Sequence, residues 1–248
     1  MLGIIGGTGL TQLANLEISH RRVSRTPYGE PSGALIFGSI NGHEVVFLAR
    51  HGYGHTIPPH QVNYRANLWA LQFEGAQDIV SVATVGGIRP QLIPGTIVIP
   101  DQIIDYTYGR KHTFHDGTDQ AVTHIDFTVP YCQRMRELCM KAAGAIGESY
   151  VDGGVYATVQ GPRLETAAEI NRLERDGATM VGMTGMPEAS LARELDMSYA
   201  AVCVVANYAA GRGNSAHGIR YQDIDAVLDV SMQRVRSIIE QVVVLHGA

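Results

Sequence analysis

Several features that mark specialised classes of protein are scarce in this sequence of 248 residues. Charged residues make up only 17%, and acidic residues outnumber basic ones to give a formal net charge of −5. A general nucleic-acid binder needs a basic face to neutralise phosphates, so we expect no nucleic-acid partner. No uncharged apolar run reaches the roughly 18 residues that a membrane helix requires, so we expect no membrane partner. A local pocket for one small anion is compatible with this charge balance.

Cysteine is scarce as well. Cys132, Cys139 and Cys203 are an odd number and show no CxxC spacing. We expect all three to be buried free thiols, which suits a reducing compartment. The first residues contain no basic region followed by an apolar signal segment. The sequence therefore predicts a cytoplasmic protein.

Hydrophobic residues are plentiful at 45%, enough for a large core. Strand-like and helix-like segments alternate from residue 78 onward, without an internal repeat or linker. We predict a single α/β domain over residues 1–248, with a mixed, mostly parallel β-sheet flanked by helices. The expected strands are Leu2–Ile5, Ala34–Ser39, Glu44–Ala49, Asp78–Thr84, Thr96–Ile99, Ile103–Tyr106, Val155–Val159, Thr179–Met183 and Tyr199–Ala206. The expected helices are Val62–Phe73, Pro130–Ala145, Glu165–Arg175, Pro187–Leu195 and Ile224–Leu245, and residues 108–129 are expected to form a long functional loop.

Two glycine-containing segments that follow strands suit a compact anion. In Gly6-Gly7-Thr8-Gly9 the glycines let the backbone approach a ligand, and Thr8 adds a hydroxyl donor. Arg50 and His51 follow the strand Glu44–Ala49, and an arginine side chain can bind phosphate with two hydrogen bonds. Taken alone, the first segment is also explained as a tight turn and the second as a loop with a surface arginine.

Two threonines also stand where expected strands end. Thr84 closes Asp78–Thr84, and Thr184 follows Thr179–Met183. At the carboxyl ends of neighbouring parallel strands, their hydroxyls would converge on the crevice served by the two segments above. The result would be a phosphate site of neutral donors plus one firm charge. Either threonine alone is equally explained as a capping hydroxyl.

The spacing of these segments disfavours two other kinds of site. His51, His55 and His60 lack a helical HExxH pattern or matched Cys/His spacing, so we expect no metal. The glycine segment lacks the third glycine of a dinucleotide fingerprint, and no Gly-Lys-Ser/Thr follows it. An NAD-binding oxidoreductase and a P-loop protein are therefore not expected.

A carboxylate and an amide also follow strands. Glu165 comes after Val155–Val159, and Asn207 comes after Tyr199–Ala206. If both face one pocket, they match the edge of a 6-oxopurine, which has an N–H beside a carbonyl. Taken alone, Glu165 is also explained as an early helical residue favoured by the helix dipole, and Asn207 as a residue that turns the chain.

An ordered set of motifs carries a family resemblance over nearly the whole chain. These motifs are Ile4-Ile5-Gly6-Gly7-Thr8-Gly9-Leu10, Arg50-His51-Gly52, His55-Thr56-Ile57, Val62-Asn63-Tyr64-Arg65-Ala66-Asn67-Leu68-Trp69-Ala70-Leu71, Gln160-Gly161-Pro162-Arg163, Met183-Thr184-Gly185-Met186-Pro187-Glu188 and Ala206-Asn207-Tyr208. The chain resembles the trimeric purine nucleoside phosphorylase family, and within it the methylthioadenosine phosphorylase branch. The resemblance implies inorganic phosphate as co-substrate, no metal or organic cofactor, and a homotrimer.

Carried onto this chain, the resemblance also implies roles for particular residues. The phosphate-binding set would be Thr8, Arg50, His51, His55, Thr84, Val85 and Thr184. Met183 would lie beneath the ribose, and Leu164 would join Glu165 and Asn207 at the base. His124 would reach the 5′ end of a nucleoside bound in a neighbouring subunit. We expect Tyr221 and Ile224 to cover the 5′ group in the same pocket.

The chain departs from the methylthioadenosine branch at the base. Those enzymes usually carry Asp-Tyr-Asp where this chain has Asn207-Tyr208-Ala209, and Ser where it has Glu165. Glu and Asn at these positions resemble instead the inosine and guanosine phosphorylases of the family. We expect Glu165 to accept the N1–H of hypoxanthine and Asn207 to bond N7 and O6, so both act in catalysis.

The expected activity is phosphorolysis of S-methyl-5′-thioinosine to hypoxanthine and 5-methylthioribose 1-phosphate. Two alternatives in the same class are a phosphorylase of inosine and guanosine and a methylthioadenosine phosphorylase with an unusual base site. A 5′-hydroxyl bonded by Tyr221 or His217 would favour inosine. An alternative of another class is a non-catalytic nucleoside-binding protein.

Overall fold

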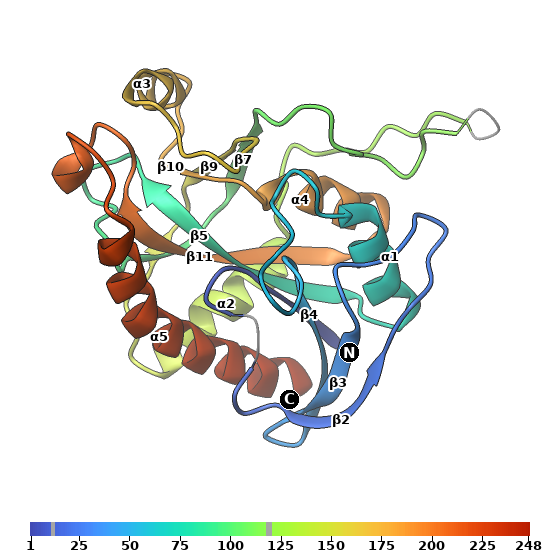
Figure 1. Cartoon of the computed structure of the whole chain (residues 1–248). Coiled ribbons are helices and arrows are strands. Elements are labelled where there is room, and N and C mark those ends of the chain that lie inside the picture. The colour runs from blue at the N-terminus through green and yellow to red at the C-terminus, as the bar shows by residue number, and fades with distance from the viewer. Residues whose placement is uncertain (11–12, 118–120) are drawn as a thin grey trace.

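The computed structural model describes residues 1–10, 13–117 and 121–248. In these residues an 11-stranded sheet is flanked by five α-helices (Figure 1). The strands are β1 (Leu2–Gly6), β2 (Glu17–Arg22), β3 (Leu35–Ile40), β4 (His43–Ala49), β5 (Asp78–Gly87), β6 (Ile97–Ile99), β7 (Gln102–Asp105), β8 (Val151–Asp152), β9 (Val155–Thr158), β10 (Met180–Gly182) and β11 (Ser198–Tyr208). The helices are α1 (Tyr64–Phe73), α2 (Gln133–Ala145), α3 (Ala167–Arg175), α4 (Gly185–Glu194) and α5 (Tyr221–Gly247), with a short 3₁₀ helix η1 (Gly213–Ser215).

The predicted α/β fold with a mixed, mostly parallel sheet is confirmed. β1 lies between β4 and β5 and is parallel to both. β11 is parallel to β5 along almost its whole length, and β9 is parallel to β7 and β10. Antiparallel pairs join β2 to β3, β3 to β4, β5 to β10, and β6 to β11. The carboxyl end of β1 therefore lies beside the central part of β5, and the carboxyl end of β4 lies on the other side of β1.

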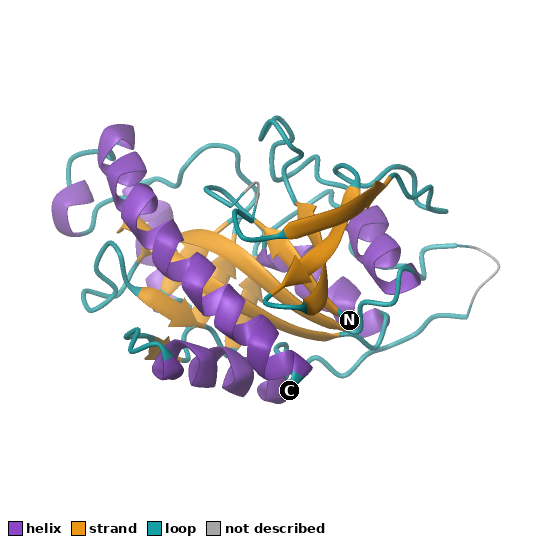
Figure 2. Ribbon diagram, turned by 90° about the horizontal axis from the view of Figure 1, so that it is seen from below, coloured by secondary structure: helices purple, strands orange, loops and turns teal. Residues whose placement is uncertain are grey.

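Alternation along β11 explains how one sheet supports two helical layers. Val202 and Val204 belong to the core with α2 and α5, whereas Ala201 and Cys203 belong to the core with α1 and α4. Successive side chains of a strand point to opposite faces, so a strand covered on both sides is apolar throughout. Figures 1 and 2 show the long C-terminal helix α5 crossing one face, with α1 and α4 on the other.

Asn41-Gly42 stands between two β-rich runs, where this dipeptide predicts a hairpin, and the hairpin is present. Ile40 pairs with His43 across the antiparallel strands β3 and β4. Asn41 and Gly42 have φ angles of 51° and 79°, the left-handed conformation that both central residues of a type I′ turn require. The turn determines the register of β4 against β3. Arg50 then follows Ala49, the last residue of β4, at the edge of the sheet that holds the site.

Several predicted boundaries were wrong. β5 does not end at Thr84 but continues through Gly86-Gly87, because these glycines permit close packing: a Cβ on Gly87 would stand 2.2 Å from the Leu92 carbonyl oxygen. The two glycines therefore indicate a close approach of neighbouring backbone inside the strand, and they do not indicate its end. β10 also runs antiparallel to this part of β5. Thr84 and Thr184 consequently do not sit at the ends of neighbouring parallel strands.

Three helices begin later than predicted, among them α1, which begins at Tyr64. Two strands were missed, β2 and the two-residue strand β8. α2 begins at Gln133, after Cys132, so Pro130 is outside the helix. α3 begins after Thr166, whose hydroxyl accepts from the Glu169 backbone N–H in a capping box. β2 was missed because all its residues are exposed, which leaves no apolar alternation to detect.

The loop predicted over residues 108–129 extends from the body between β7 and α2 (Figure 1); residues 118–120 lie outside the described residues. Cys139 and Cys203 are buried free thiols as predicted, but Cys132 is only half-buried. None of the described helices is long and apolar enough to cross a membrane.

Candidate active site

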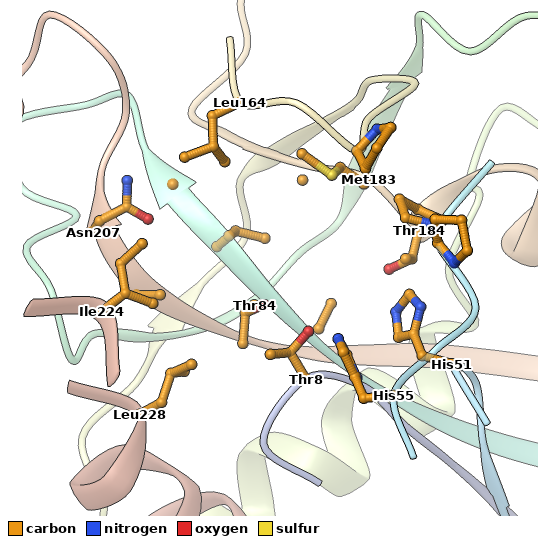
Figure 3. A pocket seen from close by; sticks show the side chains of 18 of the residues that line it. Thr8, His51, His55, Thr84, Leu164, Met183, Thr184, Asn207, Ile224 and Leu228 are labelled. Atoms are coloured by element: carbon orange, nitrogen blue, oxygen red, sulfur yellow. The ribbon is translucent and has the colours of Figure 1, made fainter. Parts of the chain in front are cut away.

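A cavity of about 480 Å³ opens beside β5, where β1, β4, β10 and β11 and the start of α5 meet (Figure 3). This volume is in the range of small-molecule sites. All the predicted site residues except His124 line it: Thr8, Arg50, His51, His55, Thr84, Val85, Leu164, Glu165, Met183, Thr184, Asn207, Tyr221 and Ile224. The fold thus brings together residues from seven separate stretches of the chain.

Three threonine hydroxyls border the end of the cavity that we call the phosphate end, with Arg50, His51 and His55. Thr8 follows β1, and Thr84 lies inside β5, where no helix needs a cap. Thr184 does occupy the N-cap position of α4, but its side chain makes no capping hydrogen bond. The capping explanation therefore fails for both Thr84 and Thr184, and their hydroxyls are available to a ligand.

Arg50 is fully buried, which excludes the surface arginine considered above. Its Nε donates to Glu188 Oε2 at 2.6 Å and its Nη2 donates to Glu188 Oε1 at 2.8 Å. Nη2 also donates to Ser81 Oγ, and Nη1 donates to the Val82 carbonyl oxygen. The arginine fork that we assigned to phosphate is thus directed at Glu188 instead.

His51 is neutral at the phosphate end. Burial lowers its pKa to about 4, with a further contribution from the positive charge of Arg50. Its Nδ1 lies 2.8 Å from the Ile57 carbonyl oxygen, so Nδ1 carries the proton and Nε2 is an acceptor. The His55 ring lies 4.7 Å from the His51 ring, centre to centre, and burial lowers the pKa of His55 as well.

Glu165 lies at the opposite end of the cavity, which we call the base end, just before the cap of α3. The guanidinium of Arg163 hydrogen-bonds Glu169 instead, binding both of its carboxylate oxygens at 2.7 and 2.8 Å. No other side chain in the described ranges donates a hydrogen bond to Glu165. Burial raises its pKa, and the nearby charge of Glu169 adds to this effect. Glu165 also borders an adjoining cavity beside Tyr106 and Tyr108.

Asn207 is inside β11, not after it. The pairing of β11 with β5 shifts register between Val205 and Asn207, and Asn207 then stands opposite Gly86. Such a bulge changes the direction of a side chain, and Figure 3 shows Asn207 on the same side of the cavity as Leu164. Its amide nitrogen donates to the Tyr208 carbonyl oxygen at 2.7 Å. The explanation of Asn207 as a turn residue therefore fails, and the amide keeps a second N–H beyond its bond to Tyr208.

Met183 lies between the two ends of the cavity (Figure 3). It packs closely on the loop after β9, since a Cβ on Gly161 would be 2.5 Å from its sulfur. Arg110 holds both pieces together: its Nη1 donates to the Met183 carbonyl at 2.8 Å and its Nη2 to the Gln160 carbonyl at 2.8 Å. Sequence reasoning missed Arg110, because one arginine in a polar loop looks like a surface residue.

Tyr221 and Ile224 line the cavity from the first turn of α5, and their expected contact with a 5′ group stays a prediction. Sequence reasoning missed Asp225 and Leu228, which follow on the same helix face; helical spacing from Ile224 would have found Leu228. His124 is exposed on the long loop and does not border this cavity. Its predicted role in a neighbouring subunit stays a prediction.

Within the described residues, no group of three or more His, Cys, Asp or Glu side chains is arranged to hold a metal. The cavity instead offers hydroxyls and one compensated arginine at the phosphate end and a carboxylate and an amide at the base end. Such an arrangement can bind an oxyanion and a planar heterocycle side by side.

Comparisons with known proteins agree with this arrangement. The Phosphorylase superfamily profile matches residues 1–244, and the chain belongs to this family. A probable S-methyl-5′-thioinosine phosphorylase from Pseudomonas syringae is 51% identical over 239 residues, covering 96% of each chain. The 6-oxopurine nucleoside phosphorylase of Pyrococcus furiosus is 46% identical over 215 residues, covering 85% of this chain and 80% of that one. Methylthioadenosine phosphorylase from Schistosoma mansoni in complex with adenine superposes with a TM-score of 0.93 at 32% identity, covering 99% of this chain and 91% of the other.

Proposed function

We propose that this protein cleaves S-methyl-5′-thioinosine with inorganic phosphate, giving hypoxanthine and 5-methylthioribose 1-phosphate. The observation that carries this proposal is that Glu165 and Asn207 border the same cavity as the threonine hydroxyls. The relatives named above support the reaction class and a 6-oxopurine base.

The base end acts on the leaving group. Cleavage of the glycosidic bond gives the sugar oxocarbenium character and places negative charge on the purine. Asn207 bonds N7 and O6, and Glu165 accepts the N1–H of hypoxanthine. Hydrogen bonds that strengthen as charge develops lower the barrier more than bonds of constant strength.

The phosphate end supplies the nucleophile. Phosphate is held by Thr8, Thr84 and Thr184, near Arg50, and attacks the anomeric carbon as the base leaves. Nε2 of neutral His51 accepts a hydrogen bond from the hydroxyl of a monoprotonated phosphate, which keeps its proton. The scheme needs no covalent enzyme intermediate, metal or organic cofactor.

Glu165 distinguishes 6-oxopurines from 6-aminopurines. Adenine has a lone pair at N1 and leaves the half-buried carboxylate without a donor. An unpaired buried polar group costs about 1–3 kcal/mol or more. Sites built around a substrate hydrogen bond can reject analogues that lack it by roughly 10⁴-fold. Methylthioadenosine should therefore be a poor substrate.

The 5′ group and the assembly complete the proposal. Met183, Tyr221 and Ile224 form an apolar surface for a methylthio group, and His124 of a neighbouring subunit in a homotrimer covers it. The buried thiols Cys139 and Cys203 suit a reducing compartment such as the cytoplasm.

The proposal is tested with methylthioinosine, inosine, methylthioadenosine and adenosine, each assayed with and without phosphate. We expect hypoxanthine release that depends on phosphate, with the highest kcat/KM for methylthioinosine. A higher value for inosine would identify a general 6-oxopurine phosphorylase. A higher value for methylthioadenosine would contradict the role of Glu165, and nucleoside binding without cleavage would indicate a binding protein.

A further inference from the structure

Glu188 is a fully buried acid with no assigned role, located in α4 behind the phosphate end. Its Oε2 accepts from Arg50 Nε at 2.6 Å. Its Oε1 accepts from Arg50 Nη2 at 2.8 Å, Ser81 Oγ at 2.7 Å and Tyr199 Oη at 2.8 Å. Four hydrogen bonds to one buried carboxylate leave it a single orientation.

This network determines what Arg50 can offer to a ligand. A guanidinium has five N–H donors. Glu188 takes two of them, Ser81 takes a third and the Val82 carbonyl takes a fourth. The remaining N–H belongs to Nη1, which lies against Gly7: a Cβ there would be only 2.9 Å from Nη1. Because Gly7 has no side chain, Nη1 can stay next to the loop that carries Thr8.

We propose that Glu188 is a positioning residue for phosphate: it fixes the plane of the Arg50 guanidinium so that its one uncommitted N–H faces the phosphate end. The inference rests on the proposed phosphate site and extends it to a residue that never touches substrate. Glu188 acts through the bidentate contact, since rotation of the Arg50 plane would break two parallel hydrogen bonds at once.

The test compares three variants with the wild-type protein. Glu188→Gln keeps the volume but replaces one acceptor by a donor, which opposes an N–H of Arg50. Glu188→Asp keeps the negative charge but shortens the side chain by one methylene, which moves the carboxylate away from Arg50. The matched control is Glu74→Gln, since Glu74 accepts from Arg22 and Ser24 far from the cavity.

We expect Glu188→Gln to raise the KM for phosphate by about 10-fold or more, while the KM for the nucleoside changes by less than about 2-fold. Glu188→Asp should lie between this variant and wild type, and Glu74→Gln should match wild type. A role limited to stability would instead reduce the fraction of folded enzyme and leave both KM values unchanged. Unchanged or lower phosphate KM values in the Glu188 variants would overturn the proposal.

A binding measurement separates this inference from the proposed reaction. Phosphate should raise the melting temperature of wild type and Glu74→Gln, and raise it much less in Glu188→Asp. If Glu188→Gln does not fold, Glu188→Asp decides by the same two readouts. A wild-type protein that is stabilised by phosphate but cleaves none of the four nucleosides would contradict the reaction and leave the Glu188 proposal standing.

Discussion

The two ends of the cavity are built in opposite ways. At the phosphate end, Arg50, Glu188 and Ser81 are buried and bonded to one another before any ligand arrives. At the base end, Glu165 and Asn207 are half-buried, and no side chain among the described residues donates to the Glu165 carboxylate. A substitution in the buried network of Arg50, Glu188 and Ser81 would disrupt several hydrogen bonds at once. Glu165 on its loop and Asn207 on its bulge can be substituted with little effect on the stability of the core. The relatives agree, since their names share a phosphorolysis reaction and differ in the purine.

The largest expected effect on this difference between the two ends of the cavity comes from replacing Arg50. Arg50→Met leaves Glu188 as an unpaired buried charge, which should cost about 3–5 kcal/mol of unfolding free energy. Urea unfolding measures this, and Arg50→Met/Glu188→Leu should recover most of the loss. Arg172→Met removes the partner of Asp176 at an ion pair that is exposed on both sides and should cost less than about 1 kcal/mol. Equal losses in the two single variants would contradict the picture of a rigid phosphate end.

The base end is tested by Asn207→Asp. An aspartate accepts the N6–H of adenine but repels O6 of hypoxanthine. The ratio of kcat/KM for 6-oxo over 6-amino nucleosides should fall by about 100-fold or more. Asn171→Asp, on α3 outside the cavity, is the control. An unchanged ratio would remove Asn207 from base recognition.

The pH dependence of the base end follows from Glu165. Burial raises its pKa above the ordinary carboxyl value, so protonation begins at a higher pH than for an exposed glutamate. Because only the ionised form accepts N1–H, kcat/KM for methylthioinosine should fall as pH drops through that raised pKa. Glu165→Gln should lack this acidic limb and lose about 10- to 100-fold at neutral pH. If the acidic limb of the kcat/KM profile persists in Glu165→Gln, it arises from the titration of a residue other than Glu165.

The smallest expected effect concerns His51 at the phosphate end. Its folded pKa of about 4 lies below the ordinary value, so the unfolded chain binds the proton first. Stability is therefore complete above about pH 6.5 and declines toward pH 4, by about 1–3 kcal/mol from this group. His51→Asn, whose amide can still donate to Ile57, should show a shallower decline. His217→Asn is the exposed control, and equal slopes in both variants would contradict the assignment.

Much of the fold was predictable from local sequence. Val202 to Val205 read as a strand because a strand covered on both faces needs apolar residues at every position. Asn41-Gly42 defined its hairpin because few residues adopt two consecutive left-handed conformations. β2 was not predictable, because an exposed strand is held by backbone pairing with β3 and carries no hydrophobic pattern.

The composition of the site was predicted better than its internal bonding. The ordered motifs indicated which residues would meet, and all but His124 do so in one chain. They did not show that Arg50 is committed to Glu188, since the two residues lie 138 positions apart. Arg110 was missed for a similar reason: its partners are backbone carbonyls, which every sequence contains.

The sequence alone determined the α/β class, the ordered motifs, and the presence of a glutamate and an asparagine at the proposed base site. Those properties depend on residue type and on short-range spacing, which can be read directly. Only the tertiary structure decided that Arg50 faces Glu188, that Asn207 stands on a bulge, and that His51 is a neutral acceptor. Each of these depends on which distant groups share a buried space, because burial and pairing determine where a charge or a proton is stable.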